Sequence, residues 1–89
     1  MHTTTRRLLR RPEVRQATGK TDSFLDRDIR HGLFPQPVKL SPDPSRRAVG
    51  WPSDEVEAVT DAVIAGASAD EVRQLVADLV ALRGKREVV

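Results

Sequence analysis

Apolar positions follow helical spacing in four segments of the chain, and a glycine follows each segment. The first helix is predicted over residues 12–18, because proline suits a first turn and Gly19 can adopt the left-handed conformation that ends a helix. The second begins after Thr21, a favourable N-cap, and its Leu25 and Ile29 share one face. Two short helices joined by a tight, glycine-containing turn predict a helix-turn-helix.

The stretch "GLFPQPVKL", residues 32–40, interrupts the helical spacing and predicts a rigid corner. Proline fixes its φ angle, donates no backbone hydrogen bond and favours extended geometry in the residue before it. We therefore expect Phe34 to fold back onto the two helices as a core residue, and residues 38–40 to form a strand. A partner strand is predicted over residues 48–51, after a connection rich in turn formers. This two-stranded hairpin would be the wing of a winged helix-turn-helix.

The third predicted helix lies in the C-terminal half of the chain. Ser53 is its expected N-cap, Val56, Val59 and Val63 follow helical spacing, and Gly66 ends it.

A fourth helix is predicted from a capping box, in which Ser68 pairs with Glu71, to Gly84. Its apolar stripe consists of Val72, Leu75, Val76 and Leu79. Such a stripe must cover the core of its own domain, a second copy of the chain, or another protein. Core packing is our first expectation. Cooperative self-association through the stripe, and a protein-interaction module that works through it, are the alternatives.

Charge is divided unevenly along the chain. Residues 1–52 carry eleven Lys or Arg and five Asp or Glu, a net charge of +6, whereas residues 53–89 carry four and eight, a net charge of −4. A basic half beside an acidic half favours a polyanionic partner on one side of the molecule. The plainer alternative is solvation of ordinary surface residues.

The outer face of the second helix is the strongest candidate for contact with such a partner. With Leu25 and Ile29 pointing inward, the opposite side of a helical wheel carries Ser23, Arg27, Arg30 and His31. An exposed arginine on a helix can read guanine edges or hold phosphate in the major groove of DNA. The alternative for this face is again ordinary solvation.

Further candidate contacts flank this helix. Free backbone N–H groups at its start, with Lys20 and Thr21 beside them, suit one phosphate group. Lys39, Arg46 and Arg47 on the wing are predicted to lie over the adjacent minor groove or the DNA backbone. Thr21 also has the simpler role of a helix cap, and the wing cations that of loop decoration.

Other classes of function find little support in the sequence. It contains no Ser/His/Asp set, no glycine-rich phosphate loop and no cysteine, and His2 and His31 are too far apart to suggest a metal site. We therefore expect no catalysis, no cofactor and no bound metal. No apolar run is long enough to span a bilayer, so no membrane partner is expected.

Length and the order of elements give the expected organisation. Eighty-nine residues allow one small domain. We divide the chain into a flexible N-terminal arm, residues 1–6, a winged helix-turn-helix DNA-binding domain, residues 7–66, and a C-terminal helix with a loose tail, residues 67–89. The predicted fold class is mainly α with a small β-hairpin.

The stretch "RLLRRPEVRQATGKTDSFLDRDIRHGLFPQPVKL", followed by "RRAVGW" and "SDEVEAV", resembles the AlpA-like family of phage regulators and its excisionase relatives. These are small winged-helix proteins akin to the DNA-binding domain of MerR regulators. The likeness covers residues 7–65 and implies DNA binding, with the second helix in the major groove and the wing beside it. By position, Thr21 would cap the recognition helix, Arg27 would match the family's usual arginine, and Arg30 falls where a basic residue is common.

The resemblance also implies a biological role. It indicates an excisionase, or recombination directionality factor, that binds and bends attachment-site DNA and favours excision by a partner integrase. The integrase would be a tyrosine or a serine recombinase. A transcription regulator of phage or integrative-element genes is the alternative. In both cases the expected partner is double-stranded DNA, and the expected location is the bacterial cytoplasm, in association with the nucleoid.

Three acidic residues depart from the family pattern. Asp26 stands where an aromatic residue is frequent, Asp28 where an apolar residue is frequent, and Asp22 where a polar or basic one is frequent. We expect all three to lie toward the flanks of the outer face and to lower non-specific affinity for DNA. Asp26 lies four residues before Arg30, a spacing that permits an ion pair within the helix.

Overall fold

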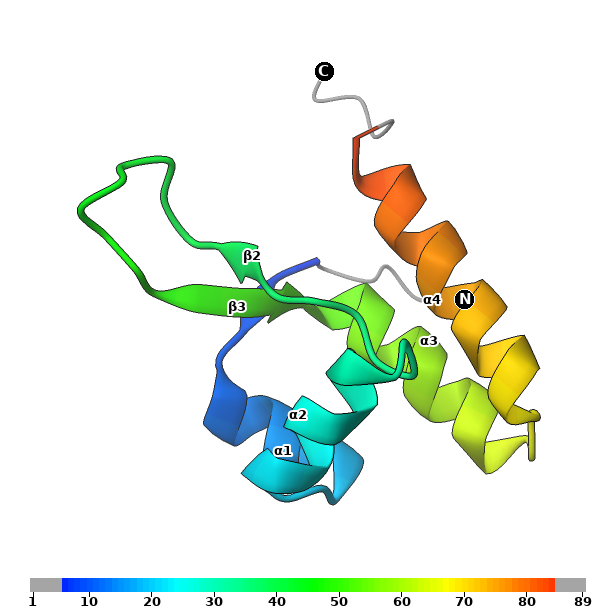
Figure 1. Cartoon of the computed structure of the whole chain (residues 1–89). Coiled ribbons are helices and arrows are strands. Elements are labelled where there is room, and N and C mark those ends of the chain that lie inside the picture. The colour runs from blue at the N-terminus through cyan, green and yellow to red at the C-terminus, as the bar shows by residue number, and fades with distance from the viewer. Residues whose placement is uncertain (1–5, 85–89) are drawn as a thin grey trace.

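The structure is a computed structural model that describes residues 6–84. In chain order its elements are β1 (Leu8–Leu9), α1 (Arg11–Thr18), α2 (Asp22–Arg30), β2 (Val38–Lys39), β3 (Val49–Pro52), α3 (Ser53–Ile64) and α4 (Ala69–Arg83). In this part of the chain, four helices accompany a small antiparallel sheet, and a long loop between β2 and β3 protrudes as the wing (Figure 1). The predicted fold class is confirmed: a winged helix-turn-helix with an additional C-terminal helix. The expectations of a flexible arm over residues 1–5 and a loose tail over residues 85–89 lie outside the described residues.

The helix-turn-helix has the predicted local structure. Gly19 has a φ angle of 73°, which L side chains rarely adopt, and its N–H donates to the Arg15 carbonyl at 2.8 Å. The Thr21 hydroxyl then accepts a hydrogen bond from the Phe24 N–H at 3.2 Å. α1 therefore ends, and α2 begins, through contacts within a few residues of the turn.

The sheet has three strands, in the order β1–β3–β2, rather than the two of the predicted hairpin. β2 and β3 pair antiparallel as predicted, with Val38 opposite Gly50. The additional strand is β1, in which Leu9 lies opposite Trp51. Leu9 is buried, whereas Leu8 remains exposed. Two residues are too few to show the alternation by which a strand is recognised in a sequence.

The start of α3 differs from the prediction, whereas Gly66 follows its last turn as predicted, with a φ angle of 82°. Ser53 is the first residue of the helix, and Pro52 is its N-cap. The Ser53 hydroxyl instead accepts a hydrogen bond from the Arg7 N–H at 3.0 Å, and the Ser53 N–H donates to the Arg7 carbonyl at 2.7 Å. At the other end, Val63 is 54% exposed, because Ala62 packs against the core in its place.

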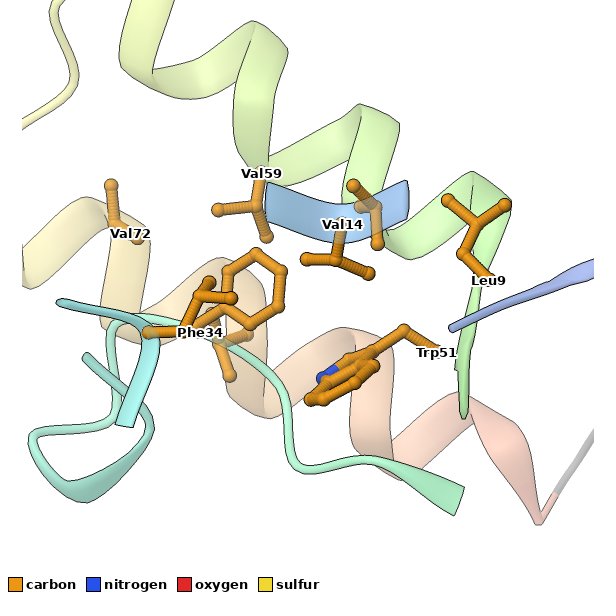
Figure 2. Close-up of a cluster of buried hydrophobic side chains, with 9 residues drawn as sticks. Leu9, Val14, Phe34, Trp51, Val59 and Val72 are labelled. Carbon is orange, nitrogen blue, oxygen red and sulfur yellow. The ribbon is translucent and has the colours of Figure 1, made fainter. Parts of the chain in front are cut away.

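Two aromatic residues lie at the centre of the core (Figure 2). Trp51 and Phe34 are fully buried, with ring centroids 6.2 Å apart, and Phe34 has the predicted core position. The Trp51 indole Nε1 donates to the Pro35 carbonyl at 2.8 Å, so its one polar group is satisfied. The remaining core residues are aliphatic: Leu9, Val14, Leu25, Val56, Val59, Val72 and Val76.

The apolar stripe of α4 covers this same core. Val72 and Val76 are buried, and Leu75 and Leu79 pack against the core from partly buried positions. The stripe therefore has a packing partner within its own domain, and self-association or a protein-interaction module through Val72, Leu75, Val76 and Leu79 stays an untested alternative. The core-packing expectation accounts for α4: a small, mainly aliphatic core gains apolar area from a further helix.

A buried ion pair joins the end of α4 to α3. The Glu55 side chain is fully buried, and the Arg83 guanidinium donates to both of its oxygens, at 2.6 Å and 2.9 Å. Arg83 Nη2 also donates to the Gln36 carbonyl at 2.7 Å. The Arg6 guanidinium lies 4.0 Å from the same carboxylate. Arg83 therefore connects the last turn of α4 both to α3 and to the proline-containing segment of residues 32–40.

Candidate nucleic-acid interface

The outer face of α2 is as open as the sequence predicts. Ser23, Arg27, Arg30 and His31 are all exposed. The inward positions are occupied by Leu25, which is fully buried, and by Ile29, which packs against the core. Neither Arg27 nor Arg30 makes an ion pair or a side-chain hydrogen bond with any of residues 6–84. Both guanidinium groups are therefore available to a ligand.

Two of the three acids of α2, Asp22 and Asp26, pair with arginines of α1. The Arg11 guanidinium lies 3.1 Å from Asp26 and 3.4 Å from Asp22, and the Arg15 guanidinium lies 3.5 Å from Asp22. The intrahelical pair that the spacing of Asp26 and Arg30 permits does not form. Arg30 consequently remains unpaired, while two acidic residues that departed from the family pattern serve to hold α1 against α2.

Lys20 does not occupy the position that we predicted for it. Its ammonium lies 2.6 Å from the Asp28 carboxylate, and both side chains are largely buried, at 15% and 11% exposure. The same ammonium lies 5.1 Å from the ring centroid of Phe24 and 5.5 Å from that of Phe34. This corrects Lys20 as a candidate phosphate contact, because an ammonium paired in this way would have to leave a carboxylate behind. Asp28, which we expected at a flank, points inward for the same reason.

Replacing Lys20 by methionine should therefore affect folding more than binding. We expect the free energy of unfolding to fall by about 1–3 kcal/mol, the usual cost of leaving a buried polar partner unsatisfied. The salt dependence of DNA binding should remain unchanged. Thermal melting, together with binding measured at several salt concentrations, checks both statements. A stable variant with a weaker salt dependence would restore Lys20 as a phosphate contact.

The first turn of α2 borders an open hollow of about 610 Å³. Its lining consists of Pro12, Arg15, Gln16, Lys20, Thr21, Asp22 and Ser23. Thr21 has the capping role, and its contact with phosphate stays a prediction. The Asp22 carboxylate also lies at this end of the helix, where it pairs with Arg15.

The wing carries exposed cations on β2 and around a hydrogen-bonded turn. Lys39, Arg46 and Arg47 are exposed. The backbone N–H and the hydroxyl of Ser45 both donate to the Asp43 carboxylate. These hydrogen bonds, the backbone one most, hold the pKa of Asp43 below its usual value. The Arg46 N–H donates to the Asp43 carbonyl at 3.0 Å, which closes the turn directly before the two arginines. The wing loop therefore has local structure of its own.

The cations of residues 6–84 fall into two groups. Most are committed to ion pairs within the molecule, as described above for Arg11, Arg15, Lys20 and Arg83. Six make no ion pair within the described part of the chain: Arg10, Arg27, Arg30, Lys39, Arg46 and Arg47. Five of these six were predicted contacts, and they lie on α2 and on the wing. Arg10 was not predicted, since it is one of four arginines between residues 6 and 11 and nothing local distinguishes it from the others.

Phe24 is the second residue that the sequence interpretation overlooked. It lies in the first turn of α2 and is 51% exposed, close to the arginine-bearing face. On a helical wheel Phe24 falls beside His31, which was predicted to be exposed. The same wheel could therefore have identified Phe24 as an exposed residue.

Neither a membrane-spanning helix nor a metal-binding cluster is present in the described part of the chain. Within residues 6–84, no helix has the length and apolar character needed to cross a bilayer. No group of three or more His, Cys, Asp or Glu side chains in the same range is arranged to hold a metal ion.

The comparison with protein families gives one match. Residues 7–59 match the model described as prophage CP4-57 regulatory protein (AlpA), which covers α1, α2, the wing and the first half of α3. No match was found among curated proteins or among solved structures. The match extends over more than half of the chain and includes the whole helix-turn-helix with its unpaired arginines. The chain therefore belongs to the AlpA family of prophage regulatory proteins, a family of DNA-binding regulators.

Proposed function

We propose that the protein binds duplex DNA with α2 in the major groove and the wing beside it. The observation that carries this proposal is the pair of exposed, unpaired guanidinium groups of Arg27 and Arg30 on one face of α2. A helix such as α2 is about 10–12 Å in diameter with its side chains, and the major groove is about 12 Å wide, so the helix fits the groove. In this arrangement Arg27 and Arg30 meet base edges or phosphates.

The other candidate residues have supporting roles in this proposal. Ser23 and His31 flank the two arginines on the exposed face of α2, and Thr21 fixes the start of the helix through its cap. Lys39, Arg46 and Arg47 neutralise phosphates beside the groove that α2 enters. No step of this function requires catalysis, a cofactor or a metal.

We further propose that the biological role is that of an excisionase, a recombination directionality factor. Five of the six unpaired cations lie on α2 or on the wing, and the wing protrudes from the domain (Figure 1). Charge neutralisation on one side of the duplex, at two separate points, favours bending toward the protein. A bent attachment site would place DNA for a partner integrase, a tyrosine or serine recombinase, in the bacterial cytoplasm.

The test combines binding, bending and excision on the attachment site of the element that encodes the protein. Circularly permuted DNA fragments report the bend, and the excision reaction uses the integrase of the same element. We expect Arg27→Ala and Arg30→Ala each to weaken specific binding by about 1–3 kcal/mol, or about 5–150-fold, and to lower excision in parallel. Melting temperatures should stay close to that of the unmodified protein, because neither side chain packs in the core.

Ala77→Glu provides a charge-matched control, since it also lowers the net charge by one unit and lies at an exposed position of α4. It should leave specific binding nearly unchanged. Binding at a promoter without bending, and without any effect on excision, would favour the transcription-regulator alternative. An absence of duplex binding at low salt would overturn the proposed function as a whole.

A further inference from the structure

Phe24 is an exposed aromatic residue beside the arginine-bearing face of α2. Its side chain is 51% exposed and is not part of the core cluster. With Thr21, Ser23 and Arg27 it lines a hollow of about 300 Å³ on α2. A large apolar side chain in this position has water on one side, although Leu25 next to it is fully buried. Packing within the domain therefore does not account for it.

The ring is supported from within the molecule. The Lys20 ammonium lies 5.1 Å from the ring centroid, and that ammonium is itself held 2.6 Å from Asp28. A cation at this distance attracts the face of an aromatic ring. One side of the ring is thus anchored by a largely buried ion pair, while the rest is presented to solvent beside Arg27.

The distance between Phe24 and Arg27 along α2 lies between one and two base-pair steps of duplex DNA. Residues three apart on a helix have Cβ atoms about 5–6 Å apart, and successive base pairs of duplex DNA are about 3.4 Å apart. If Arg27 contacts one base pair in the major groove, Phe24 faces a base pair one or two steps away. The apolar group on the major-groove edge of the four base pairs is the C5 methyl of thymine.

We propose that Phe24 contacts the C5 methyl group of a thymine and so selects a T·A base pair one or two steps from the base pair that Arg27 reads. This inference rests on the proposed function, because it requires α2 to lie in the major groove. It adds a specificity element that contains no hydrogen bond and that charge alone would not supply.

The test removes the methyl group from the DNA. The full chain first selects its preferred site from a random duplex library. Each thymine of that site is then replaced in turn by deoxyuracil, which differs only by the missing methyl. At one or two adjacent positions we expect the unmodified protein to lose about fourfold in affinity. This is the effect of losing the burial of one methyl group. Phe24→Ala should bind the thymine and uracil duplexes equally.

Arg27→Ala is the matched control, because it should bind more weakly overall and yet keep the same sensitivity to uracil. Melting temperatures establish that Phe24→Ala is folded, and Phe24→Gln, a polar residue with good helix propensity, is a second variant that removes the ring.

Two results would overturn this inference alone: tight, sequence-selective binding with no loss at any uracil, or a loss that persists in both Phe24 variants. A failure of the unmodified protein to bind any duplex would overturn the proposed function together with it.

Discussion

Replacing Arg83 by alanine is expected to lower the free energy of unfolding by about 3–5 kcal/mol. The change leaves the fully buried Glu55 carboxylate without the guanidinium that donates to both of its oxygens. It also leaves the Gln36 carbonyl without its donor. Arg6, 4.0 Å from the same carboxylate, offers partial compensation, so the lower end of the range is our expectation. Thermal melting should show a drop of at least about 12 °C for a domain of this size.

Two further variants distinguish the buried pair from a general effect of lost charge. Arg73→Ala removes an arginine of the same helix whose two contacts, with the Asp70 carboxylate and the His31 carbonyl, are both exposed, and it should cost about 1 kcal/mol or less. Replacing both partners by apolar residues, as in Glu55→Leu with Arg83→Met, should restore most of the lost stability, because no buried charge remains. A melting temperature for Arg83→Ala within two degrees or so of the unmodified protein would contradict the assignment.

DNA affinity should fall on the order of a thousandfold between about 50 and 200 mM salt. Each phosphate neutralised by Lys or Arg contributes a slope of about −0.9 to the dependence of log affinity on log salt concentration. Six cations are unpaired in the described part of the chain. If each meets one phosphate, the slope of log affinity against log salt concentration is expected to be about −5. Fluorescence anisotropy with a labelled duplex, repeated across the salt range, measures the slope directly.

The slope can be assigned to particular cations. The double variant Arg46→Ala with Arg47→Ala should reduce its magnitude by about two, since both wing arginines are unpaired. Arg73→Ala should leave it unchanged, because that guanidinium is already paired with Asp70. A flat response to salt would rule out the interface assigned to α2 and the wing.

The local signals in the sequence were sufficient for most of the helical structure. Gly19 ends α1 and Thr21 caps α2, because both act through hydrogen bonds to residues within four positions along the chain. The capping box of Ser68 and Glu71 starts α4 in the same way. Phe34 takes its core position where Pro35 and Pro37, which follow it, restrict the path of the backbone.

The sequence also identified much of the candidate interface. Arg27 and Arg30 are exposed, as the helical wheel predicts from the buried Leu25. The wing cations Arg46 and Arg47 likewise lie on an exposed loop. These predictions held because exposure on a short amphipathic element follows from its own periodicity.

Only the tertiary structure decided which charges remain free. Arg11 pairs with Asp26 across two helices, Lys20 turns inward to Asp28, and Arg83 reaches Glu55 over 28 positions of sequence. The same applies to β1, a strand of two residues that forms only because β3 lies beside it. It applies also to the apolar stripe of α4, because whether the stripe packs on the core depends on whether other elements already cover that core. Helix caps and periodic faces are set by short-range hydrogen bonds and geometry, which the sequence by itself determines. The choice of an ion-pair or packing partner depends on which elements meet in space, and that is settled only when the whole core has assembled.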